Sequence, residues 1–127
     1  MRQGNRLAFA LATLMAAGCG RSPPPSMDVA EARAAVVAAL DAWKDGAPAQ
    51  RLRERAPAID FRDLSWDNGA SLKKYAVEKE ETAGASAKVT VRLHLTEKSG
   101  AGRTRVVVYN VDAGPTIVIR PDTLALD

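Results

Sequence analysis

The chain has 127 residues, a formal net charge of +3 at pH 7, one cysteine and one histidine. A single cysteine excludes an internal disulfide framework. With one histidine and one cysteine, the chain also has too few ligands for the usual zinc site, which takes three or four nitrogen and sulfur ligands.

The first 18 residues have the order of a secretory signal peptide. Arg2 and Arg6 supply its positive region, and the apolar run 7–17 is shorter than the ~20 residues needed to span a bilayer. The run leads into Ala16-Ala17-Gly18-Cys19, which resembles a bacterial lipobox, where the cysteine is lipidated and becomes the new N-terminus. The resemblance predicts lipidation of Cys19 and a location in the cell envelope, outside the cytoplasm. The alternative is an ordinary cleaved signal with an incidental cysteine. Gly20, in place of aspartate, favours the outer membrane where one is present.

Removal of the predicted signal peptide lowers the net charge of the chain. The 18 basic and 15 acidic residues become 16 and 15 once Arg2 and Arg6 are lost, a net charge of about +1. The charge therefore does not favour nucleic acid as a partner.

Residues 19–27 are predicted to form a tether, because the prolines at 23–25 favour polyproline II. Residues 28–127 are long enough for one domain.

The strongest periodic pattern begins at Asp28. Asp28 and Glu31 have the spacing of a capping box, and apolar residues then recur at steps of three and four. This pattern predicts a long helix that ends near Gly46 and packs one stripe against a core. The stripe consists of Val29, Ala32, Val36, Ala39, Leu40 and Trp43. A second, short helix is expected from residue 48 to residue 56.

After Pro57 the hydrophobic period changes to two, which is typical of strands. In the clearest strand, at 88–97, alternate residues are predicted to point inward: Val89, Val91, Leu93 and Leu95. The expected order is a strand at 59–61, a loop at 63–69, strands at 72–80 and 88–97, a hairpin loop at 98–102, a central strand at 103–111 and a last strand at 116–120. A helix followed by antiparallel hairpins predicts an α+β domain with the helix packed on a sheet.

Short motifs across most of the predicted domain resemble those of a group of small uncharacterised bacterial lipoproteins. They are Trp43-Lys44-Asp45-Gly46, Pro48, Ala56-Pro57, Trp66, Gly69-Ala70, Tyr75, Tyr109-Asn110-Val111, Pro115 and Ile119-Arg120. The resemblance implies a helix cradled by a curled antiparallel sheet of about four strands, similar to cystatin-like or nuclear-transport-factor-2-like (NTF2-like) folds. It implies no activity, because folds of this shape host enzymes, binding modules and passive domains.

The chemical inventory is small, and the sequence predicts no catalytic residue, metal site or cofactor. His94 falls on the solvent side of its strand, and no carboxylate stands at a spacing that would orient it as a general base. The EF-hand spacing and its closing glutamate are absent around Asp60, Asp63 and Asp67. We interpret these three residues as turn and strand-edge residues.

Two hypotheses from different classes remain. The first is a non-enzymatic, lipid-anchored domain whose partners are the membrane, through Cys19, and another envelope protein. The second is an NTF2-like small-molecule-binding protein or enzyme, with a cavity between helix and sheet lined by Trp66 and Tyr75. The lack of an acid–base constellation in the sequence favours the first hypothesis.

The outward side of strand 88–97 is the predicted contact surface. One helix covers only one face of a sheet, so four residues are expected to line the other face: Thr90, Arg92, His94 and Thr96. The neighbouring strand adds either Val106 and Val108 or Val107 and Tyr109 to that face. A mixed apolar and basic surface of this kind predicts docking of a partner protein or a neighbouring subunit.

Overall fold

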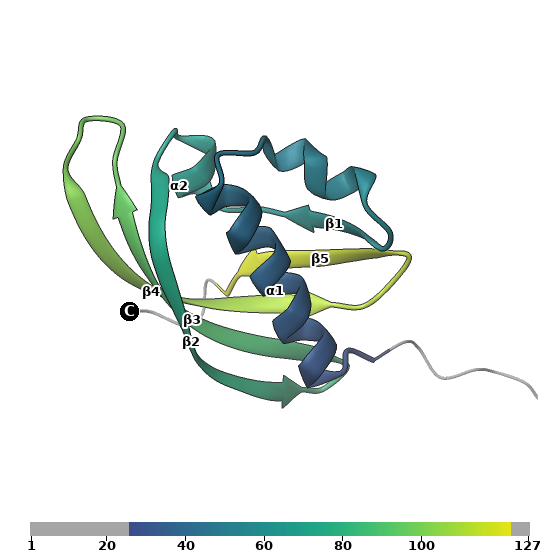
Figure 1. Cartoon of the computed structure of the whole chain (residues 1–127). Helices are drawn as coiled ribbons and strands as arrows, with labels where there is room; N and C mark the ends of the chain where they lie inside the picture. Colours follow the sequence, from purple (N-terminus) through teal and green to yellow (C-terminus); the bar gives the residue numbers. More distant parts are fainter. Residues whose placement is uncertain (1–25, 123–127) are drawn as a thin grey trace, which may run out of the picture.

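The computed structural model describes residues 26–122, in which a helix of 16 residues packs on a five-stranded sheet (Figure 1). The predicted signal peptide, Cys19 and most of the tether lie outside these residues, as do residues 123–127. The elements in chain order are α1 (Val29–Lys44), η1 (Ala49–Glu54), β1 (Ala58–Phe61), α2 (Leu64–Asp67), β2 (Ser71–Ala83), β3 (Ser86–Thr96), β4 (Gly102–Asp112) and β5 (Thr116–Pro121). The predicted α+β class is confirmed.

Helix α1 confirms the predicted cap and stripe. The Asp28 carboxylate accepts a hydrogen bond from the Glu31 N–H at 3.2 Å, which satisfies one of the free donors at the helix start. The buried residues of α1 are Ala32, Ala35, Val36, Ala39, Leu40 and Trp43. Val29, in the first turn, is only partly buried. Gly46, with φ of 80°, adopts the left-handed conformation that ends many helices.

Helix α1 runs from one end of the sheet to the other. At its start, Met27 is buried, and its N–H donates to the Ala85 carbonyl at 2.8 Å, beside the β2–β3 turn. At its end, Trp43 Nε1 donates to the Ala70 carbonyl at 2.8 Å, just after α2. Met27, the last residue of the predicted tether, therefore lies at the β2–β3 turn, and α2 lies at the opposite end of α1 (Figure 1).

The sheet has the strand order β1-β5-β4-β3-β2 and is mixed. The expectation of about four antiparallel strands is therefore confirmed only in part. The strands lie near the five ranges that the alternation predicted, but β1 is parallel to β5, with Ala58 opposite Thr116. Hairpin patterns reveal pairing between strands that are neighbours in sequence. The four-residue β1 pairs with a strand far along the chain, and a parallel pair needs a long crossover that leaves no turn signature.

The core lies between α1 and the inner face of the sheet. Val89, Val91 and Leu93 are fully buried and Leu95 is nearly so, as the alternation predicted. Strand β4 is the middle strand of the sheet, which confirms its predicted central position. Its inner residues Val107, Tyr109 and Val111 are buried in the same cluster.

Two short elements differ from expectation. Residues 49–54 form a 3₁₀ helix with Pro48 in the N-cap position, which is shorter than the helix expected from residue 48 to residue 56. Residues 63–69, predicted as a loop, contain the single-turn helix α2, whose N-cap is Asp63. A helix of one turn is too short to show a hydrophobic period, so the sequence pattern does not distinguish it from a loop.

Candidate functional site

The predicted contact surface lies on the outer face of the sheet, away from α1. In the β3–β4 register, Arg92 is opposite Val106 and Thr90 is opposite Val108. Val106 and Val108 are partly exposed, whereas Val107 and Tyr109 are buried on the inner face. Thr90, Arg92, His94 and Thr96 therefore share their face with Val106 and Val108, which resolves the open choice between the two residue pairs.

The basic groups of this outer face have polar neighbours. Arg92 Nε donates to Glu78 Oε2 at 2.7 Å, and Glu78 lies where a bulge shifts the β2–β3 register. The Nδ1 atom of His94 is 3.3 Å from the Thr104 hydroxyl. The surface is thus an apolar strip of valines bordered by a hydrogen-bonded, charge-balanced rim, instead of a purely basic patch.

A buried polar cluster that the sequence did not predict joins α2 to β4. Asp63 is the one buried charged residue in the described range, with 2% of its surface exposed. Its Oδ2 accepts a hydrogen bond from the Tyr109 hydroxyl at 2.5 Å, and its Oδ1 accepts one from the Ser65 N–H at 2.8 Å. Arg105 Nη1 lies 3.7 Å from the same Oδ1 and donates to the Ser65 hydroxyl at 2.6 Å.

The hydrogen bonds of this cluster have a structural role, because they hold α2 against β4. Burial raises the pKa of Tyr109 well above 10, and the charge of Asp63 raises it further, so the phenol remains a hydrogen-bond donor at neutral pH. Both carboxylate oxygens are occupied by donors from within the domain. No sequence signal connects these residues, because Asp63 and Tyr109 are 46 positions apart. The one local signal that could have drawn attention to Asp63 is the preference of aspartate for the N-cap position, which the sequence analysis did not apply to this residue.

Trp66 and Tyr75, the residues expected to line a cavity in the second hypothesis, do not meet. Trp66 stacks on Trp43, with ring centroids 5.4 Å apart and planes 6° from parallel. The Tyr75 hydroxyl donates to Asp41 Oδ1 at 2.7 Å on the outside of α1. The space between α1 and the sheet centre is occupied by fully buried side chains that include Leu40, Leu93 and Tyr109.

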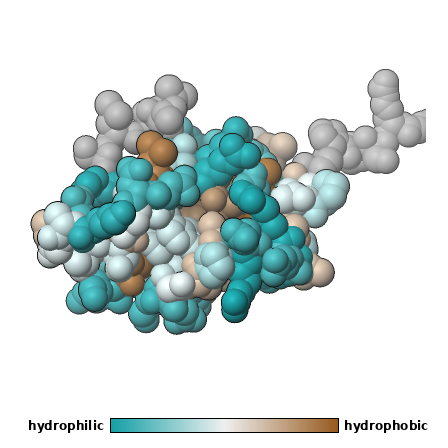
Figure 2. All heavy atoms as spheres, turned by 90° about the horizontal axis from the view of Figure 1, so that it is seen from above, coloured by the Kyte–Doolittle hydropathy of each residue, from teal (hydrophilic) through white to brown (hydrophobic). Residues whose placement is uncertain are grey.

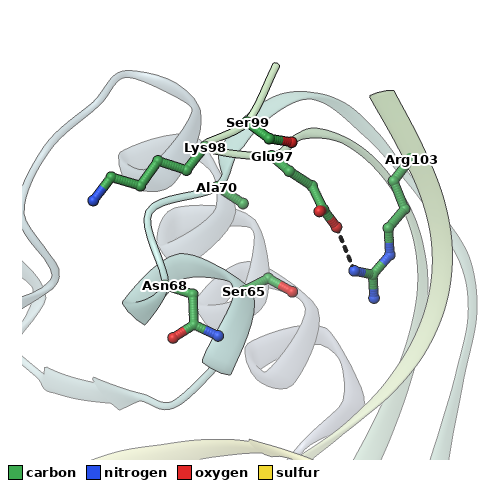
Figure 3. Close-up of a pocket in the computed structure, with 7 residues that line it drawn as sticks. All are labelled: Ser65, Asn68, Ala70, Glu97, Lys98, Ser99 and Arg103. Atoms are coloured by element: carbon green, nitrogen blue, oxygen red, sulfur yellow. Dashed lines mark hydrogen bonds and ion pairs between the residues drawn. The ribbon is translucent and has the colours of Figure 1, made fainter. Parts of the chain in front are cut away.

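A small polar hollow of about 250 Å³ lies between α2 and the β3–β4 hairpin (Figure 3). Its lining residues are Ser65, Asn68, Ala70, Glu97, Lys98, Ser99 and Arg103. Arg103 Nη1 donates to Glu97 Oε2 at 2.5 Å within this hollow, so the two charges are paired with each other.

The molecule seen from above is mostly hydrophilic, with apolar atoms in small separate areas (Figure 2).

A larger, open hollow of about 540 Å³ lies beyond the end of β5. It is lined by Arg62, Asp63, Leu64, Asp67, Arg105, Arg120 and Pro121. Leu64 is 75% exposed and is the exposed large hydrophobic residue of the described range. Arg62 is paired with Asp60 at 3.0 Å and Arg120 with Asp112 at 3.1 Å, so these two lining cations already have carboxylate partners.

Within residues 26–122, no three side chains of the metal-binding types His, Cys, Asp and Glu come together as a group that could hold an ion. None of the helices in that range has both the length and the apolar character needed to cross a bilayer. No family model, curated protein or solved structure matches this chain. Its function must therefore be inferred from its own residues.

Proposed function

We propose that this chain is a bacterial envelope lipoprotein whose small extracytoplasmic domain binds another envelope component and carries out no catalysis. The observation that carries the proposal is the lipobox-like sequence ending in Cys19. Burial of acyl chains contributes about 0.8 kcal/mol per CH₂, and two or more chains hold a protein stably at a membrane. Gly20 favours the outer membrane as the location. The likeness to cystatin-like and NTF2-like folds belongs to the same proposal, and α1 lying across the sheet supports it.

The point where the predicted tether meets the domain indicates which end of the domain lies closest to the membrane. The chain joins the domain at Met27, which is held to Ala85 beside the β2–β3 turn. Sixteen residues of α1 then carry the chain about 24 Å toward α2, at 1.5 Å per residue. The β2–β3 turn is therefore the end closest to the anchor, and the outer sheet face extends outward from it.

A binding role suits the outer face of the sheet. Its centre consists of Val106 and Val108, and its border consists of polar and charged groups such as Arg92 and His94. An apolar centre with a polar rim is the usual composition of a protein-binding surface. A non-catalytic role is supported by the buried pair Asp63 and Tyr109, whose polar atoms are bonded to each other and hold α2 in place.

The anchor is tested by replacing its one attachment atom. Cys19→Ser should abolish acylation and move the protein from the membrane fraction to the soluble fraction or to an unprocessed precursor. Intact-mass analysis of the wild-type protein should show acyl chains on Cys19. Mature wild-type protein without acyl mass would contradict the proposal.

The contact surface is tested by crosslinking in intact cells. Photo-crosslinking residues placed at Arg92 and His94 should capture a specific envelope protein. A probe at Gln50, which is exposed on η1, is the matched control and should capture much less. Equal capture from all three positions, or capture from none, would show that the outer face is not the binding surface.

A further inference from the structure

Strand β2 forms one edge of the sheet. It is the last strand in the order β1-β5-β4-β3-β2, and within residues 26–122 it pairs with β3 alone (Figure 1). It is 13 residues long, whereas β1, the strand at the other edge, has four residues. A long strand edge presents a row of backbone donors and acceptors with which another strand can pair.

The charges of β2 are divided between its two halves. Residues 71–77 contain Lys73 and Lys74 and no acidic residue, so their net charge is +2. Residues 78–83 contain three glutamates and one lysine, so their net charge is −2. Within residues 26–122, the ion pairs of β2 all come from the second half. An antiparallel copy of β2 would therefore bring each basic half against an acidic half, whereas a parallel copy would bring like charges together.

We propose that two copies of this chain associate through β2, with the strands antiparallel and Lys74 of one copy opposite Glu81 of the other. Directly opposite side chains of an antiparallel pair lie on the same face of the sheet. Lys74 is opposite His94 and Glu81 is opposite Lys88 in the register with β3, so both lie on the outer face. Glu81 also pairs with Lys79 of its own chain at 3.1 Å, an exposed contact that contributes little and can be shared.

The two bulges of β2 are compatible with this register. They insert Lys73 and Glu78 into the ladder with β3, and residues 74–77 and 79–83 are paired regularly. The proposed register places residues 74–76 of one copy opposite residues 79–81 of the other, so regular backbone meets regular backbone. A bulge often protects a strand edge by bending it, but both bulges of β2 lie outside these paired stretches.

The inner-face side chains of β2 are held by α1. The Tyr75 hydroxyl donates to Asp41 at 2.7 Å, and Glu80 pairs with Arg33 at 3.3 Å. These contacts direct both side chains toward α1 and away from the backbone edge of β2. The inference goes beyond the proposed function, because it uses the edge of the sheet instead of the outer face, and it does not depend on the lipid anchor.

The geometry is tested by disulfide crosslinking of the full chain in intact cells. Lys74→Cys combined with Glu81→Cys should give a linked dimer, because directly opposite residues of an antiparallel pair have Cα atoms about 4.5–5.5 Å apart. A link within one chain is excluded, since the two positions are about 24 Å apart along the strand. Ser71→Cys combined with Lys74→Cys is the matched control. Both positions are exposed, and the proposed register keeps them far apart between copies, so this variant should give no dimer.

The charge pairing is tested by sedimentation equilibrium of the purified full chain, which should be a dimer. Lys74→Glu should weaken the dimer by about fivefold or more, because the two-fold axis creates two contacts between like charges. Glu81→Lys should weaken it for the same reason. The double variant with both changes should restore dimerisation, because it exchanges the two charges. Lys98→Glu, on the exposed β3–β4 hairpin, is the control for the change in net charge and should have no effect.

A wild-type chain that stays monomeric at all concentrations would overturn the inference. Failure of the double variant to restore the dimer would overturn it as well, because the effect of Lys74→Glu would then not come from Glu81. Equal crosslinking of the control pair would indicate chance collisions, and crosslinking of Lys74→Cys alone would indicate parallel strands. Either result would also contradict the proposed pairing.

Discussion

The Tyr109 hydroxyl lies 2.5 Å from Oδ2 of Asp63, and this buried contact links the central strand β4 to the short helix α2. Tyr109→Phe removes the donor and leaves a buried carboxylate oxygen without it, so we expect a loss of about 1–3 kcal/mol in the free energy of unfolding. Urea denaturation gives this value directly. Tyr75→Phe is the matched control, because Tyr75 is only partly buried and its hydrogen bond to Asp41 is exposed to solvent, and it should cost within about 0.5 kcal/mol. Equal losses in the two variants would show that the buried hydrogen bond contributes no more to the free energy of unfolding than the exposed one.

Stability should fall in alkaline solution above about pH 10. Burial raises the pKa of Tyr109 well above 10, and burial together with the hydrogen bond to Asp41 raises the pKa of Tyr75 to about 12. The folded protein keeps both phenolic protons at a pH where the unfolded chain, with tyrosine pKa values of about 10, loses them. The stabilisation is therefore fully present below pH 10 and is lost as the pH rises toward the folded values.

Melting temperatures measured from about pH 8 to about pH 12 test this dependence. Tyr109→Phe should show a smaller alkaline decrease than the wild type. Phenolate absorbance supplies a separate check, because both tyrosines should remain protonated in the folded protein at pH 10. Half-ionisation near pH 10 in the folded state would contradict the prediction.

Substitutions along α1 should separate its two sides. Leu40→Ala and Trp43→Ala each empty a buried position, so each should lower the free energy of unfolding by about 2–5 kcal/mol. Arg33→Ala removes an exposed ion pair to Glu80 at 3.3 Å and should cost within about 0.5 kcal/mol. Similar unfolding curves for all three purified variants would mean that α1 does not pack as described.

The stacked indoles of Trp43 and Trp66 should report on the docking of α2. Trp66→Ala removes the ring that covers Trp43 and contacts Phe61, and we expect a loss of about 2 kcal/mol. The near-ultraviolet circular dichroism of the pair should collapse in this variant. Trp66→Phe keeps an aromatic ring and should lose less than half as much stability. An unchanged dichroism spectrum in Trp66→Ala would show that the two rings do not stack in solution.

The candidate surface was partly predictable. Alternation alone placed Thr90, Arg92, His94 and Thr96 on one side of β3, because side chains point to alternate faces with a period of two. Their neighbours on β4 were left open, since Val106 to Tyr109 is apolar at every position. The register Arg92 opposite Val106 decided which residues face outward. The Glu78 partner of Arg92 was not predictable, because it depends on a bulge in β2.

Local features of the sequence by themselves determined α1, its cap at Asp28 and the inward residues of β3, because each depends on groups a few positions apart. Only the tertiary structure decided the parallel pairing of β1 with β5 and the bond between Asp63 and Tyr109. Both join segments far apart in the chain, and closing so long a loop costs entropy that only the assembled core offsets. Many distant pairings satisfy the same apolar pattern, so the pattern alone does not select one of them.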